Sequence, residues 1–277
     1  MTSDDVEQLG SRRMRGLDRA FEILDFLRMT KRPARPNEIA TAIEAPKSTA
    51  YELVNLLLKA GALEYADRDG RVFLGRKLYF LGLAYQQQFD LTRECRAYLA
   101  RIAEETRETA QFCMLDGDKY TVVMMKEGIR PFRISSDVGE PVPLPWTASG
   151  RLLLSHLRDD EILAFIPAAD FTLPNGSRLA PERFLGEVGR ARAERFFSFD
   201  SLADTFTHCF AAPVHQDGAC VATLCIVAPK QDAARNYDRY RAVLAGAAEE
   251  FSAQLGDTPL RFPRDVAGRL DPAAAAG

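Results

Sequence analysis

The sequence has no run of apolar residues that approaches the roughly 20 needed to cross a bilayer as a helix. Its first residues, MTSDDVEQLGSRR, are polar and lack the apolar stretch of a secretory signal peptide. These two absences predict a cytoplasmic protein with no membrane partner.

The chain is also poor in the motifs of metal and cofactor sites. It has no glycine-rich phosphate loop, no HExxH motif and no cysteine pair with zinc-ligand spacing. The five cysteines are odd in number, which favours reduced thiols that mostly fill the core. They are Cys95, Cys113, Cys209, Cys220 and Cys225. We expect neither a metal nor a cofactor.

Neither sign of charge dominates, because the sequence has 36 lysines and arginines and 39 aspartates and glutamates, for a net charge of -3. Residues 12–76 differ from the rest, with 13 basic against 9 acidic side chains. A basic region in an acidic chain argues against a nonspecific DNA coater and favours a single DNA-binding head.

Residues 36–60 predict two short helices joined by a tight turn, as in a helix-turn-helix. Apolar residues recur at helical spacing, so each helix buries one face. These are Ile39, Ala40 and Ile43, then Ala50, Leu53, Val54, Leu57 and Leu58. The alternative is an ordinary helical hairpin with a solvated polar face.

The second of these helices carries the predicted DNA contacts. Pro46 suits a first helical turn, whose free amides and positive dipole end attract a phosphate. Side chains one to two turns further on occupy the part of a recognition helix that contacts base edges in the major groove. The residues predicted on these helices are Asn37, Lys47, Ser48, Thr49, Tyr51, Glu52 and Asn55.

Residues 62–74 predict a β-hairpin directly after the recognition helix, which is the position of a wing. A turn at 67–70 ends in Gly70, which can adopt positive φ. Arg68 and Arg71 flank the tip and are predicted to contact DNA, although exposed solubilising arginines are an equal alternative. A preceding helix with the stripe Leu17, Ala20, Ile23, Leu24 and Leu27 would complete a winged domain over 13–75.

The segment 76–90 predicts a linker helix. Its apolar stripe comprises Leu78, Leu81, Gly82, Tyr85 and Phe89. Because the winged domain already has its own core, we expect the stripe to pack on a second subunit and form a homodimer. Packing on the second domain of the same chain is the alternative.

Residues 91–256 alternate helix and hairpin signals, which predicts an α+β domain with an antiparallel sheet. Helices are expected over 91–107, 146–157, 181–195 and 235–255. Strands are expected over 110–115, 119–126, 131–135, 209–214 and 219–227. The tail 257–277, which ends in DPAAAAG, is expected to be disordered.

Four segments in this order resemble the IclR family of bacterial transcription factors. They are AxxIEAPKSTAYELVNLLLKAG, DGRVFLGRKLYFLG, VGEPVPLPWTASGRLLL and HCFAAPVHQDGACVATLCIVAP, and the resemblance extends from about Arg15 to about Leu255. It implies a winged helix-turn-helix, a GAF-like effector-binding domain for a small metabolite, often an organic acid, and dimers that pair into homotetramers. The implied function is ligand-responsive control of catabolic genes, as repressor or activator, through a pseudo-palindromic operator.

The resemblance also implies which residues bind the effector. Residues 146–150 open a helix whose amides suit a carboxylate, and family members place their ligand against the matching Ala148 and Ser149. Period-2 alternation places Thr207 with Cys209, and Cys225 with Val227, on single sheet faces. The predicted effector residues are Trp146, Ala148, Ser149, Phe199, Thr207, Cys209, Cys225 and Val227. A sheet face merely packed on a helix is the alternative.

The sequence departs from the family where it would choose its ligands. Phe199 replaces a frequent acidic residue, Phe206 a glycine and Trp146 a small residue, so we expect a larger or more apolar acid, lactone, aldehyde or aromatic acid. In the recognition helix, Glu52 replaces a frequent basic residue. It must therefore accept from a cytosine amino group or point away from DNA.

Two other classes of protein compete with this interpretation. An enzyme would need a nucleophile and base in contact, but neighbours such as His208 and Cys209 point to opposite faces of a strand. Ser149 lacks the flanking glycines of a nucleophile elbow. We predict no catalytic residues. The remaining alternative is a DNA-binding protein whose second domain only oligomerises.

Overall fold

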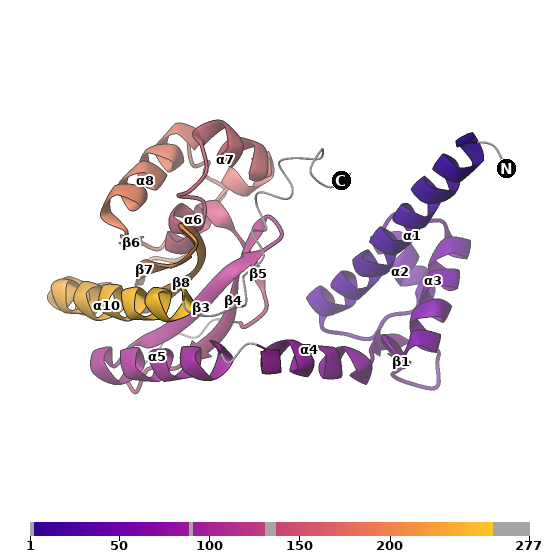
Figure 1. Ribbon diagram of the computed structural model, residues 1–277, viewed down its shortest axis with the longest axis horizontal. Coiled ribbons are helices and arrows are strands. Elements are labelled where there is room, and N and C mark those ends of the chain that lie inside the picture. The colour runs from indigo at the N-terminus through magenta and orange to yellow at the C-terminus, as the bar shows by residue number, and fades with distance from the viewer. Residues whose placement is uncertain (1–2, 89–90, 131–136, 257–277) are drawn as a thin grey trace. The chain divides into compact units, whose positions relative to one another are not determined.

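The computed structural model describes residues 3–88, 91–130 and 137–256 (Figure 1). By its internal contacts the chain divides into two units, Met1–Asp90 and Leu91–Gly277. Each unit is described by itself. None of the described helices is long and apolar enough to span a bilayer.

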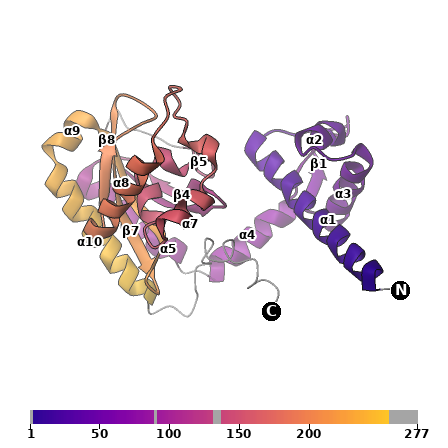
Figure 2. The ribbon, with the colours of Figure 1, turned by 90° about the horizontal axis from the view of Figure 1, so that it is seen from above.

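The first unit is a small helical domain with a hairpin. Its helices are α1 (Ser3–Thr30), α2 (Pro36–Ala42), α3 (Lys47–Ala60) and α4 (Arg76–Gln88), and its hairpin strands are β1 (Leu63–Tyr65) and β2 (Val72–Leu74). Helix α1 lies across α2 and α3 (Figure 2). The fully apolar core joins these helices to the hairpin through Ile23, Leu27, Ile39, Val54 and Val72.

The structure confirms the helix pair and the hairpin in this unit and corrects two details. Pro46 is the N-cap of α3, so the helix begins one residue later than expected, at Lys47. Leu17, placed in the buried stripe of α1, is 61% exposed, because the core ends six residues further along the helix at Ile23. Helix α3 ends at Ala60 and is capped by Gly61, whose φ of 75° suits glycine.

The second unit contains a six-stranded antiparallel sheet in the order β5-β4-β3-β8-β7-β6. The strands are β3 (Thr109–Asp116), β4 (Lys119–Lys126), β5 (Pro141–Pro143), β6 (Phe197–Asp200), β7 (Thr207–Gln216) and β8 (Ala219–Pro229). The helical segments are α5 (Leu91–Thr106), η1 (Leu144–Trp146), α6 (Ala148–Leu153), α7 (Asp159–Phe165), η2 (Ala168–Phe171), α8 (Pro181–Glu194), α9 (Lys230–Arg235) and α10 (Tyr237–Gly256).

Helices cover both faces of this sheet. Helices α5 and α10 pack on one face around Phe112, Phe210 and Phe251. Helices α6, α7 and α8 lie on the other face (Figure 1), where the core includes Leu152 and Cys225. Because strand residues alternate between faces, Cys209 and Cys225 point toward α6 while Phe210 and Ile226 point toward α10.

The α+β class and both long hairpins are confirmed, and several local expectations are corrected. The helix expected over 146–157 is divided, because Thr147 is extended between η1 and the shorter α6. The closing helix begins at Tyr237, after a separate α9 that the sequence did not predict. Strands β5 and β6 were also missed. The strand expected over 131–135, Phe89 and the tail 257–277 lie outside the described residues.

Candidate DNA-binding surface and effector site

The polar face of α3 is open to solvent, as its periodicity predicted. Ala50 and Val54 turn into the core, and the opposite face presents Lys47, Ser48, Tyr51, Glu52, Asn55 and Lys59, with Thr49 half-buried beside them. Helix α3 therefore packs on the core through one side only. Its other side carries hydrogen-bonding groups suited to base edges and phosphates.

A groove of about 380 Å³ runs beside this face. It brings Asn37 from α2 together with Tyr51 and Asn55 of α3. The wing contributes Tyr65, which is 66% exposed and was not predicted as a contact. An aromatic at an outward position of a short, half-buried strand was the available sequence signal.

The wing tip is organised by Asp67. One oxygen of its carboxylate accepts hydrogen bonds from the amides of Asp69 and Arg71 at 2.9 and 3.0 Å, and Gly70 supplies the positive φ of the turn. Arg68 and Arg71 are both exposed. Neither lines the groove, although Asp69 and Gly70 of the same tip do, so the two arginines lie outside it.

In the second unit, the segment before α6 is closely packed. Thr147 is extended, and its side-chain oxygen accepts a hydrogen bond from the amide of Gly150 at 3.0 Å. A Cβ atom on Gly150 would lie 2.1 Å from the carbonyl oxygen of Leu144, so only glycine fits here. Ala148 and Ser149 are buried at the start of the helix.

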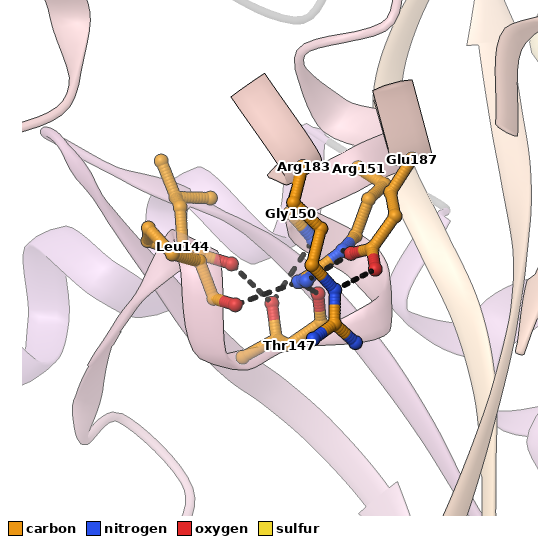
Figure 3. A network of polar contacts seen from close by, with 7 residues as sticks. Leu144, Thr147, Gly150, Arg151, Arg183 and Glu187 are labelled. Atoms are coloured by element: carbon orange, nitrogen blue, oxygen red, sulfur yellow. Dashed lines mark hydrogen bonds and ion pairs between the residues drawn. The ribbon is translucent and has the colours of Figure 1, made fainter. Parts of the chain in front are cut away.

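Arg151, whose role the sequence did not predict, holds this segment in place. Its side chain is fully buried, and one guanidinium nitrogen donates to the carbonyl oxygens of Pro145 and Thr147 at 2.7 and 2.6 Å (Figure 3). Two further nitrogens donate to one oxygen of Glu187 on α8, whose other oxygen accepts from Arg183. The network fixes the start of α6 against α8.

Aromatic rings enclose the same guanidinium. Its carbon lies 4.8 Å from the ring centroids of Phe184 and Phe199 and 5.4 Å from that of Phe197. Burial lowers the pKa of Arg151 to about 10, against the opposing effect of Glu187. Burial opposes ionisation of Glu187, but Arg151 and Arg183 together outweigh it and lower the pKa of this carboxyl group. Both groups are therefore charged at neutral pH.

A chain of hydroxyl and thiol groups lies beneath the start of α6. Thr223 Oγ1 donates to Ser149 Oγ at 2.8 Å, and Ser149 Oγ lies 2.9 Å from Cys225 Sγ. On the other side of Cys225, Cys113 Sγ lies 3.9 Å away and is itself 2.9 Å from the Tyr120 hydroxyl. The structure thus brings two predicted effector residues, Ser149 and Cys225, into contact.

The other predicted effector residues occupy neighbouring strands. Cys209 pairs directly with Phe199 on β6 and with Val227 on β8, so these three share one face. Burial raises the pKa of Cys209 to about 12. Thr207 begins β7, and its hydroxyl donates to Asp204 at 2.6 Å.

Trp146 lies in η1, where its indole nitrogen donates to the carbonyl oxygen of Asp170 at 2.9 Å. The indole is half-buried. Its hydrogen bond therefore goes to the backbone of η2 and not to the other predicted effector residues.

The His208 side chain lies on the opposite face from Cys209, as strand alternation predicted. Its Nδ1 atom is 2.8 Å from Asp200, and its ring packs against Phe210 and Tyr237. A His–Cys catalytic pair is therefore not formed. Within the described residues, no group of three histidine, cysteine or acidic side chains is placed to hold a metal ion.

Two family models together match most of the chain. The model of the IclR helix-turn-helix domain matches residues 16–67. The model described as "Bacterial transcriptional regulator IclR C-terminal" matches residues 83–253, more than half of the sequence.

Curated and solved relatives agree with these matches. The Pca regulon regulatory protein of Pseudomonas putida is 25% identical over 248 residues, 87% of this chain and 84% of the relative. An IclR transcriptional regulator from Alicyclobacillus acidocaldarius superposes with a TM-score of 0.74 at 21% identity, covering 87% of this chain and 99% of that one. An IclR homologue from Microbacterium hydrocarbonoxydans, crystallised with 4-hydroxybenzoate, gives 0.72 at 21% identity, with 88% and 100% covered.

Proposed function

The chain belongs to the IclR family of bacterial transcriptional regulators, and we propose that α3 contacts its operator while the sheet face beneath α6 binds its effector. One observation carries the proposal. The exposed polar face of α3 lies beside an open groove in a unit whose core is wholly apolar, whereas the second unit places hydroxyl and thiol groups inside.

The proposed operator contacts are the predicted set of Asn37, Lys47, Ser48, Thr49, Tyr51, Glu52, Asn55, Arg68 and Arg71. Exposure supports them, since all but the half-buried Thr49 are exposed. The groove adds support for base contacts by Tyr51 and Asn55, and the exposed arginines suit phosphates.

The proposed effector residues are Trp146, Ala148, Ser149, Phe199, Thr207, Cys209, Cys225 and Val227. We propose an aromatic or otherwise apolar acid, or a lactone or aldehyde of similar size. The surroundings support this class, because aromatic rings at Phe197 and Phe199 flank Arg151 beside the start of α6. The Microbacterium homologue bound to 4-hydroxybenzoate is a precedent for an aromatic acid.

We propose that α4 mediates dimerisation, which would present two copies of α3 to a pseudo-palindromic operator. Its apolar side chains support this role. Tyr79, Phe80, Leu81 and Tyr85 are 64, 60, 57 and 52% exposed. We further propose that effector binding changes the spacing of the paired heads through this helix.

The experiment combines two measurements on the full chain. Thermal-shift screening compares 4-hydroxybenzoate and other aromatic acids, lactones and aldehydes with two- and three-carbon acids. Stabilisation by the small acids alone would contradict the proposed effector class. Operator affinity, measured on the intergenic DNA beside its own gene, should change with each stabilising compound. No change with any of them would favour a second domain that only oligomerises.

A further inference from the structure

The hydrogen bonds beneath α6 converge on one sulfur atom. Thr223 donates to Ser149, so the single hydroxyl proton of Ser149 is free to point at Cys225, 2.9 Å away. From the other side, the thiol of Cys113 donates to Cys225. The Tyr120 hydroxyl, at 2.9 Å, can then donate to Cys113. Donors surrounding a sulfur stabilise its thiolate form.

The two cysteines are therefore unlike. Burial opposes ionisation of Cys225, but its hydrogen bonds, foremost those from Cys113 and Ser149, lower its pKa. Burial instead raises the pKa of Cys113 well above that of an ordinary thiol. Because the donors converge on Cys225, we assign it as the attacking sulfur and Cys113 as the thiol that follows it.

Strand register places the pair within reach of each other. Gln111 of β3 lies opposite Cys225 of β8, and Cys113 lies opposite Thr223, so the cysteines are diagonal neighbours on one face. Their sulfur atoms are 3.9 Å apart. A disulfide requires about 2.05 Å. Small side-chain rotations and a local shift of the strands must supply the difference.

We propose that Cys225 and Cys113 form a modification site for hydroperoxides, which oxidise the pair to an intramolecular disulfide that alters operator binding. The Cys225 thiolate attacks one peroxide oxygen, the O–O bond breaks, and hydroxide leaves, forming a sulfenic acid. Cys113 sulfur then attacks the Cys225 sulfur and displaces hydroxide, while the Cys113 proton goes to water. Two thiols and one hydrogen peroxide thus give a disulfide and two waters.

The disulfide would act on the start of α6. It converts Cys225 into a weaker acceptor, which weakens the contact with Ser149, and it draws β3 and β8 together directly beneath the helix. Hydroperoxide would thus be a second chemical signal at the sheet face proposed for the effector. The oxidation does not require a bound effector.

Intact-mass measurement of the reduced full chain with hydrogen peroxide tests the chemistry. We expect a loss of about 2 Da, reversed by dithiothreitol, and a crosslinked peptide containing Cys113 and Cys225. Cys209→Ser is the matched control, because Cys209 shares the same face and should leave the crosslink intact. Cys113→Ser should instead accumulate a Cys225 sulfenic acid that dimedone labels.

Two outcomes would overturn the modification site: no mass loss with peroxide, or a mass loss that persists in Cys225→Ser. Melting curves of the three serine variants test whether they remain folded, and dimedone labelling of Cys113→Ser reports on Cys225 even without the crosslink. For regulation, we expect oxidation to change operator affinity at least about fivefold in the wild type and not in Cys113→Ser. A complete disulfide with unchanged affinity would contradict the regulatory role.

Discussion

The two units of this regulator differ in where their polar side chains lie, because only the second unit buries some of them in its interior. Among the residues whose burial the structure describes, all buried polar or charged side chains lie in the second unit, from Thr106 to Thr223. The first unit buries apolar side chains, and its described polar side chains, among them those on the face of α3, are not buried. A DNA-binding surface must meet a large partner from outside, whereas a small ligand is recognised by groups held inside.

Removal of Arg151 should break this contrast most strongly. In Arg151→Met, Glu187 loses its buried partner and two carbonyl oxygens lose their donor, so the second unit should be destabilised by about 3–5 kcal/mol. Hydrogen exchange with mass spectrometry should show the loss in that unit and leave α3 unaffected. The exposed Arg158→Met is the control, and an equal loss there would contradict the role of burial.

A methyl group at Gly150 should have the next largest effect. Its Cβ would overlap the backbone of Leu144, which cannot move like a flexible side chain, so Gly150→Ala should cost about 1–3 kcal/mol. Gly186→Ala in α8 is the matched control, because nothing lies within 4 Å of its Cβ position. That variant should gain about 0.5–1 kcal/mol in helix stability. Urea unfolding followed by circular dichroism distinguishes the two signs.

On the outer face of α3, substitutions should change binding and not stability. Glu52→Ala should relax preference at one operator position by about 1–3 kcal/mol if the carboxylate accepts from a base. Lys47→Ala should lower the affinity for all operator sequences alike. It should also reduce the slope of log affinity against log salt concentration by about the value of one phosphate contact. Binding to an operator library at two salt concentrations measures both effects, and identical behaviour of the two variants would refute the assignment.

The smallest effect is expected at Glu64. A hydrogen bond from the Arg76 side chain lowers the pKa of this exposed carboxyl group. The resulting stability is present above the pKa of the unfolded state and is lost as pH falls through the folded pKa. Glu64→Gln should therefore melt slightly below the wild type at neutral pH, with the difference disappearing in acid. A difference that grows in acid would contradict this sign.

Sequence periodicity was sufficient to predict the first unit, because its core is formed by apolar residues at regular spacing along α1, α2 and α3. The second unit was harder for a physical reason. Arg151 and Glu187 are 36 residues apart and Ser149 and Cys225 are 76 apart, so their contacts exist only after folding. A charged residue within a helix is usually exposed, so the burial of Arg151 could not be predicted from its position.

Strands β5 and β6 were missed for a different reason. They are only three and four residues long, too short for alternation to distinguish them from loops. The prolines that bound β5 and the aromatic residues in β6 obscured the pattern further. Yet β6 carries Phe197 and Phe199, which pack on Arg151.

The hydrogen bond between Trp146 and the Asp170 carbonyl has a spectroscopic consequence. Trp146 is the only tryptophan in the chain, so selective excitation of indole addresses this single position. Its emission wavelength depends on the polarity around a half-buried ring two residues before Ala148. The native chain therefore carries its own unlabelled optical probe at the proposed effector site, while the DNA-binding head contributes no indole signal.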